Sequence, residues 1–375
     1  MSQYRAPSDP EEKPYAFVPL ADPRVAQRQI AAGHHTVCGS RTAGLHTGFI
    51  EGVIVSDSPL HVATGIVEPL TDEFFQTRPD LTIGGHRRHD ADNLVLPHTA
   101  TRDGASGKVV RIIPGSTMKG LIRAVIEAIT NPGMQFTPQR KGKKVENKVE
   151  GEQFTSAPLP PKLTVASRLF GITAKDKGYQ GHCRFADAPQ VSGGAELFRR
   201  LPLYSPRPGE AGPQFYFKVP DRVFKGRKFY RREDYQESSP PYILVESCRS
   251  GSKFRFRVDF DALSLAELGV ILIALGAEHT DQGLKDKTIP YLKVGGGKPV
   301  AFGSVRFTQL RVHTLLPETY TDFESKTTEL DIRESVEQAF KSGLLFIDGF
   351  DELRAIMTDR RTRKRGGCSP EERIY

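Results

Sequence analysis

The sequence has few cysteines, and their spacing excludes two common uses of this residue. The four cysteines lie far apart along 375 residues, and no two form a CxxC pair. This spacing argues against a disulfide framework and against a zinc ribbon. A metal site formed by His34, His35, Cys38 and His46 is conceivable, although scattered histidines and cysteines are more often ordinary loop or core residues.

The sequence also lacks a long hydrophobic run. No stretch of about 18 apolar residues occurs, and the first thirteen residues are polar and acidic, unlike a basic segment followed by an apolar one. We therefore expect a cytoplasmic protein with no membrane partner. With 375 residues and 38% hydrophobic content, the chain can bury the core of one large domain with insertions or of two compact domains.

The balance of charge favours a polyanionic partner. The formal net charge is +8 and the isoelectric point is near 9.2, and lysine and arginine gain affinity for nucleic acid by displacing counterions from phosphates. A solvated basic surface would have the same composition. Residues 199–235 hold ten Lys or Arg against four Asp or Glu, with aromatic residues between them. This pattern is typical of single-stranded RNA binding but equally of a packed hairpin.

Hydrophobic periodicity predicts an order of strand, helix, strand, strand, helix, strand, which is the split βαβ order of a ferredoxin-like, or RRM-like, α+β fold. The predicted strands are 48–56, 182–186, 253–260 and 303–313, the helices are 117–130 and 264–276, a short helix covers 165–170, and a strand at 242–247 forms a hairpin with 253–260. Residues 68–110 are rich in His, Asp, Arg and Gly, which predicts a long surface loop.

The domain organisation follows from this order. We expect an N-terminal docking segment (1–46), a ferredoxin-like core (47–315) with large insertions at about 66–111, 132–164 and 199–240, and an extension (316–375) with a helical part at about 330–357 and a basic tail.

Residues 112–123 are the most informative segment. Pro114 and Gly115 predict a tight turn, and Ser116 can cap the helix that follows. Lys119 and Arg123 are four residues apart and so share a helix face, opposite the apolar stripe. Cations near the start of a helix oppose its dipole, an arrangement that a bound phosphate would offset. A purely structural helix start is the alternative.

A second glycine-rich segment precedes the last strand. The amides of Gly295, Gly296 and Gly297 could form a concave anion site, with Lys298 adding charge. The segment lacks the spacing and the trailing Ser or Thr of a nucleotide-triphosphate P-loop. A plain tight turn is the commoner reason for such a sequence.

Five ordered stretches together resemble the RAMP superfamily of CRISPR proteins, and most closely the backbone subunits of type III effector complexes. The stretches are 14–20, 46–48, 113–123, 167–171 with 185–188, and 295–304. The resemblance implies a subunit that binds the backbone of a CRISPR guide RNA, with complementary target RNA and other CRISPR effector subunits as partners, and with one insertion serving as a thumb. It implies RNA contacts at Gly115, Ser116, Lys119, Arg123, Arg168, Gly295, Gly296, Gly297 and Lys298.

The resemblance also implies a catalytic aspartate. Active backbone subunits carry an aspartate in a loop before the glycine-serine helix, and Asp92 is the closest match, with Asp90 as the alternative. Such a carboxylate could hold Mg²⁺ or another divalent metal, or orient a 2′-hydroxyl for cleavage of target RNA. Here the loop is long and Leu94 stands where proline is usual. The alternatives are a non-catalytic structural subunit and a guide-processing endoribonuclease with His46 or His61 as general base.

Overall fold

A computed structural model of the chain describes residues 15–20, 29–31, 44–83, 94–130, 162–173, 178–203, 217–218, 223–224, 226–235, 242–277, 290–316, 319 and 326–361. Its centre is an antiparallel sheet in which β22 (Ser304–Leu315), β3 (His46–Ser56), β20 (Lys253–Leu263) and β12 (Cys183–Phe185) are neighbours in that order. Short strands extend this sheet: β21 (Leu292–Lys293), β23 (Thr327–Glu329), β13 (Ala188–Ser192), β8 (Val109–Ile113) and β7 (Ala100–Arg102).

The alternation of side chains along β20 shows why this sheet forms. Phe254 and Phe256 are buried, whereas Arg255 and Arg257 between them are exposed. Successive side chains of a strand point to opposite faces, so β20 presents an apolar face and a basic face. The apolar face belongs to the main hydrophobic core of the protein.

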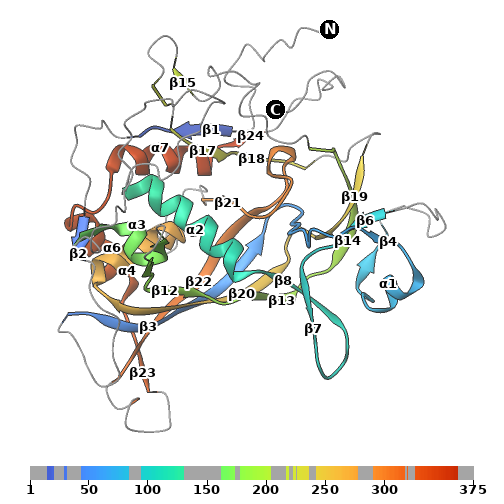
Figure 1. The fold of residues 1–375 in the computed structure, drawn as a ribbon, viewed down its shortest axis with the longest axis horizontal. Coiled ribbons are helices and arrows are strands. Elements are labelled where there is room, and N and C mark those ends of the chain that lie inside the picture. Colours follow the sequence, from blue (N-terminus) through green and yellow to red (C-terminus); the bar gives the residue numbers. More distant parts are fainter. Residues whose placement is uncertain are drawn as a thin grey trace.

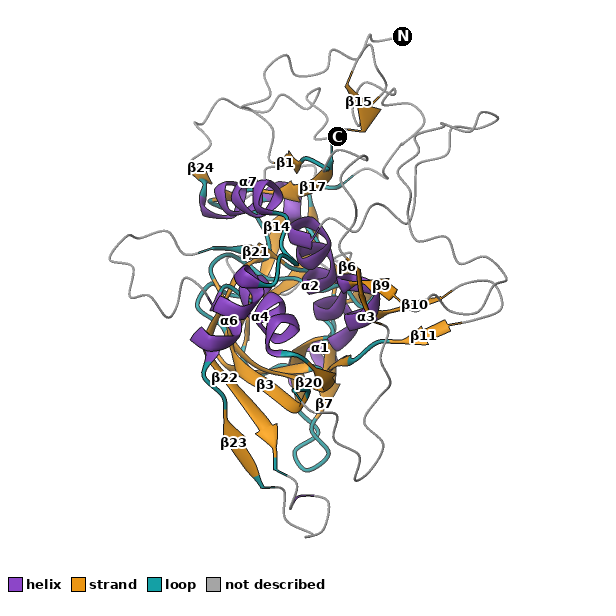
Figure 2. Ribbon diagram, turned by 90° about the vertical axis from the view of Figure 1, so that its left-hand side faces the viewer, coloured by secondary structure: helices purple, strands orange, loops and turns teal. Residues whose placement is uncertain are grey.

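Three helices cover the apolar face of the sheet (Figure 2). They are α2 (Gly115–Thr130), α3 (Val165–Phe170) and α4 (Leu265–Ala274). Along α2 the buried residues Met118, Ile122 and Ile126 recur at helical spacing. At the start of α4, Ser264 and Glu267 form a capping box that satisfies the free amides.

The chain order β3, α2, β12, β20, α4, β22 is the predicted one, and Figure 1 shows its strands and helices as two layers. The short helix at 165–170 is confirmed as predicted. The strand beginning at 46 and the helix beginning at 115 each start two residues before their predicted bounds.

Two sequence predictions are wrong, and both concern a second, five-stranded sheet. Residues 68–110 do not form only a surface loop, because they contribute several short elements and buried residues such as Leu81 and Val95. The predicted hairpin of 242–247 with 253–260 does not form, because the first strand joins a separate five-stranded sheet, in which successive residues on both of its faces are buried. That sheet has the order β4 (Glu68–Pro69), β6 (Leu94–Leu96), β19 (Ile243–Cys248), β14 (Ala195–Arg200) and β5 (Leu81–Thr82), with α1 (Asp72–Gln76) beside it (Figure 1).

The predicted C-terminal helical part is confirmed as two helices, α6 (Ile332–Lys341) and α7 (Ile347–Thr358). The first packs against α4 and the second against α2. None of the helices in the described ranges is long and apolar enough to cross a membrane. The remaining strands form two-stranded pairs: β1 (Tyr15–Val18) with β17 (Arg227–Tyr230), β2 (Gln29–Ala31) with β9 (Lys162–Thr164), β10 (Gly171–Thr173) with β11 (Gly178–Gln180), β15 (Phe217–Lys218) with β16 (Val223–Phe224), and β18 (Arg232–Glu233) with β24 (Arg360–Arg361).

Candidate nucleic-acid interface

The start of α2 is built from two of the sequence stretches quoted above. Gly115 donates its backbone N–H to Oδ1 of Asp187 at 2.8 Å. A β-carbon at Gly115 would lie 2.1 Å from the carbonyl oxygen of Phe185, so only glycine permits this close approach. The expectation that Ser116 caps the helix is wrong, because the helix already includes Gly115 and the capping carboxylate comes from Asp187. Ser116 is exposed.

Lys119 and Arg123 lie on one face of α2, as predicted, but they differ in their contacts. Arg123 donates from Nε to Oε1 of Glu127 at 2.8 Å and from a terminal nitrogen to the carbonyl of Gly171 at 3.2 Å. Glu127 also receives a hydrogen bond from Arg227 at 2.9 Å. Lys119 is half-buried and makes no hydrogen bond or ion pair to any residue in the described ranges. A phosphate would therefore meet an unpaired cation at Lys119 and a partly neutralised one at Arg123.

Arg168 lies inside the protein, where its side chain is 4% exposed. It donates to Oε1 of Glu267 at 2.5 Å and to the carbonyl of Ala262 at 2.8 Å. His182 donates from Nδ1 to the carbonyl of Asp261, which leaves its Nε2 as an acceptor facing Arg168 at 3.2 Å. This burial corrects the expectation that Arg168 presents its charge to RNA: its guanidinium binds protein acceptors and joins α3 to α4.

The glycine-rich loop is a tight turn packed on a neighbouring segment. Gly295 and Gly297 have φ values of +75° and +74°, a conformation that favours glycine. The amide of Gly296 donates to the carbonyl of His61 at 2.9 Å, so the expectation of successive free amides is wrong at this residue. Lys298 is half-buried without a described partner, and burial lowers its pKa. Lys298 is therefore the candidate phosphate-binding side chain of this loop.

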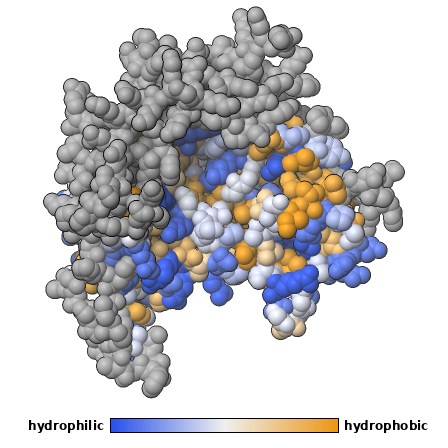
Figure 3. All heavy atoms as spheres, viewed as in Figure 1, coloured by the Kyte–Doolittle hydropathy of each residue, from blue (hydrophilic) through white to orange (hydrophobic). Residues whose placement is uncertain are grey.

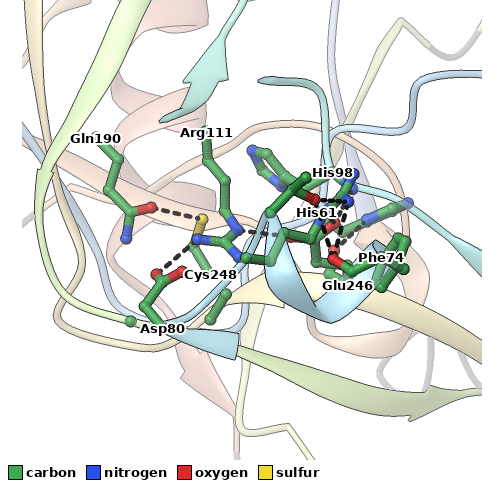
Figure 4. Close-up of polar contacts among 12 residues, drawn as sticks. His61, Phe74, Asp80, His98, Arg111, Gln190, Glu246 and Cys248 are labelled. Carbon is green, nitrogen blue, oxygen red and sulfur yellow. Dashed lines mark hydrogen bonds and ion pairs between the residues drawn. The ribbon is translucent and has the colours of Figure 1, made fainter. Parts of the chain in front are cut away.

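A buried polar cluster joins the two sheets, and the sequence did not predict it (Figure 4). The carboxylate of Glu246 accepts from Nε of Arg111 at 2.7 Å, from Nε of Arg78 at 3.2 Å and from the amide of His98 at 3.1 Å. Arg111 also pairs with Asp80 at 2.6 Å. These residues are up to 168 positions apart, so no local signal in the sequence could have brought them together.

Two histidines beside this cluster are neutral at physiological pH. Burial lowers the pKa of His61 to about 4 and that of His98 to about 3. His61 donates from Nδ1 to the carbonyl of Glu246 at 2.7 Å and is 0% exposed. A general base must reach the proton it removes. The buried position of His61 therefore disfavours it as the base of an endoribonuclease, whereas His46 is half-buried at the start of β3.

The predicted catalytic and metal residues Asp90 and Asp92 lie outside the described residues, as do His34, His35 and Cys38. Within the described ranges, no group of three or more His, Cys, Asp or Glu side chains is placed to hold a metal ion. Cys183 and Cys248 are buried free thiols.

A family model described as the RAMP superfamily matches residues 54–306, which is more than half of the chain and includes β20, α2 and α4. No curated protein matches the chain.

Proposed function

Because the chain belongs to the RAMP superfamily of CRISPR-associated proteins, we propose that it binds CRISPR guide RNA as a backbone subunit of a type III effector ribonucleoprotein. The observation that carries this proposal is the start of α2, where exposed Ser116 lies three residues before Lys119, a cation with no ion-pair partner among the described residues. The strand order β22, β3, β20, β12 and the helices between them support a ferredoxin-like core.

Guide binding would rely on positioned charge. Lys119 would contact a backbone phosphate, with the Ser116 hydroxyl as a hydrogen-bond donor beside it. Arg123 would contribute less than its charge suggests, because Glu127 already accepts from its Nε. Contacts to phosphates carry no sequence information, which suits a subunit that must hold guides of any sequence.

Contact with other effector subunits is supported by an apolar surface. Ile66, Val67 and Leu94 are 63%, 51% and 59% exposed, and Figure 3 shows apolar side chains gathered over the five-stranded sheet. Large apolar side chains that cluster on a surface often mark a protein interface.

We further propose that this subunit cleaves complementary target RNA. Asp92, or alternatively Asp90, would supply the carboxylate for Mg²⁺ or another divalent metal, since hard cations prefer oxygen ligands. The rival function is a non-catalytic scaffold that binds guide RNA and target RNA without cutting. Cleavage of a complementary RNA by the assembled complex, with and without a chelator, distinguishes the two.

Guide binding is tested by Lys119→Ala, with Lys341→Ala as the matched control. Lys341 is exposed on α6, so its substitution removes one positive charge away from α2. We expect Lys119→Ala to weaken binding of single-stranded guide RNA for every sequence and to reduce the slope of the salt dependence by about 0.7, the contribution of one phosphate contact to a single strand. Equal affinity and equal slope for the two variants would remove α2 from the guide site.

A further inference from the structure

The face of the central sheet that points away from α2 and α4 carries an unusual set of side chains. The strand registers identify them, because residues opposite each other in neighbouring strands share a face. They are Arg184 on β12, Lys253, Arg255, Arg257 and Asp259 on β20, Phe49, Glu51, Val53 and Val55 on β3, and Arg306, Thr308, Arg311 and His313 on β22.

Positive charge dominates this outer face and is mostly unpaired. On these four strands six Lys or Arg share the face with two acidic residues, Glu51 and Asp259. Among the residues that the structure describes, Arg257 alone of the six has an acidic partner, Asp259, at 2.8 Å. The other five cations make no hydrogen bond or ion pair to any residue of the described part of the chain. Glu51 faces His313 at 3.4 Å, and Glu329 on β23 adds an acid at the edge.

Three planar groups stack across the strands in the middle of this face. The rings of His313 and Phe49 are 4.8 Å apart with an interplanar angle of 24°. The guanidinium carbon of Arg257 lies 3.8 Å from the centre of the Phe49 ring. Asp259 holds that guanidinium through Nε at 2.9 Å, and the Arg257 side chain is 50% exposed. The Arg257 guanidinium is therefore held over the Phe49 ring by Asp259, while half of its side chain stays exposed.

We propose that this outer face is a binding surface for single-stranded RNA, separate from the α2 site. An unpaired base stacks on the Arg257 guanidinium, and the phosphates on either side contact Arg255 and Arg311. Aromatic and guanidinium planes are the groups on which proteins stack splayed bases, and unpaired cations attract the backbone. A membrane or an acidic protein would use the charge but has no need of the stack. The inference rests on the proposed RNA-binding function and adds a second surface to it.

The test separates charge from stacking in the purified full chain. The probes are a labelled single-stranded RNA of mixed sequence and an abasic RNA of the same length. Arg255→Gln with Arg311→Gln removes two charges that have no partner among the described residues. Lys108→Gln with Lys341→Gln is the control, since Lys108 is exposed in the loop before β8 and Lys341 is exposed on α6. We expect about a tenfold loss of affinity for both probes and a salt slope lower by about 1.4, because each phosphate contact to a single strand contributes about 0.7.

Arg257→Lys keeps the positive charge but removes the planar guanidinium group. We expect it to weaken binding of the mixed-sequence RNA several-fold, to leave the salt slope unchanged, and to have no effect on the abasic RNA. If Arg257→Lys affects both probes equally, the stacking assignment is wrong. If the Arg255 and Arg311 double variant binds both probes with the same affinity and salt slope as its control, the face is an ordinary solvated surface.

These outcomes are distinct from those that bear on α2. A loss of RNA affinity in the sheet variants with none in Lys119→Ala would contradict the α2 assignment and support the sheet surface. A loss in Lys119→Ala with none in the sheet variants would support the α2 assignment and contradict the sheet surface. An unmodified chain that binds neither probe would overturn both proposals. Arg255, Arg257 and Arg311 are exposed, and an unchanged thermal unfolding midpoint confirms that the variants remain folded.

Discussion

Gly115 and Asp187 are joined by a hydrogen bond of 2.8 Å from the amide of the first residue of α2 to a carboxylate 72 positions later in the chain. The bond ties the candidate RNA-binding helix to the segment between β12 and β13. It also places a negative charge where the helix dipole favours one, so the local position of α2 depends on a residue outside the helix.

Loss of this capping bond should lower stability. We expect Asp187→Ala to reduce the free energy of unfolding by about 1 kcal/mol, because an N-terminal amide loses its acceptor. Asp187→Asn keeps a side-chain oxygen and should lose less. Urea denaturation measures both, with Asp351→Ala on the exposed side of α7 as the control. Equal stability of Asp187→Ala and the control would show that the bond contributes nothing.

The buried pair of Arg168 and Glu267 should matter for folding. Arg168→Met leaves the Glu267 carboxylate buried without its cation, and removal of one member of a buried pair costs about 3–5 kcal/mol. The double variant Arg168→Met with Glu267→Gln should recover part of this loss. Urea denaturation gives the stabilities, and RNA affinity per folded molecule should be unchanged. A stable Arg168→Met variant with weakened RNA binding would return Arg168 to the interface.

Stability should fall at mildly acidic pH. The folded-state pKa values of His61 and His98 are lowered to about 4 and about 3, so below the unfolded value of about 6.5 the unfolded chain binds more protons. Their contribution is complete above pH 6.5 and is lost as the pH falls toward 4 and 3, at up to about 1.4 kcal/mol per pH unit for each histidine.

Urea denaturation at pH 7.5 and pH 5 measures this pH dependence. His98→Gln should be less stable than the unmodified chain at pH 7.5 but should lose less stability between the two pH values. His46→Gln is the comparison for a half-buried histidine. If the unmodified chain and His98→Gln lose the same free energy of unfolding between pH 7.5 and pH 5, His98 does not stay neutral in the folded protein.

Asp92 should be needed for cleavage but not for guide binding. We expect Asp92→Ala to assemble with guide RNA and to capture complementary RNA while leaving it uncut, because an acidic group cannot itself attract phosphates. Loss of a positioning contact or a metal ligand lowers the rate by orders of magnitude. Asp90→Ala should have the smaller effect. If Asp90→Ala abolishes cleavage and Asp92→Ala does not, the catalytic residue lies two positions earlier. If the unmodified complex never cuts, the non-catalytic scaffold is the correct function.

Local patterns in the sequence were enough to predict the elements of the core. The alternation of Phe254 and Phe256 with Arg255 and Arg257 predicted β20 correctly, and the apolar spacing from Met118 to Ile129 predicted α2. Both patterns repeat within one strand or one helix, where neighbouring residues determine which face is buried. The same alternation places Arg255 and Arg257 on one face of β20. Only the strand register shows that the charged residues of neighbouring strands share this face.

Only the tertiary structure decided which residues meet. The sequence placed β19 beside β20, whereas β19 pairs with β14 and β6 in another sheet. It assigned the cap of α2 to Ser116, and the family resemblance implied an RNA contact at Arg168. In the structure Asp187 accepts from Gly115 from 72 positions away, and Glu267 pairs with Arg168 from 99 positions away. The physical reason is that the availability of a charge depends on its burial and its partners, which the fold creates between distant segments.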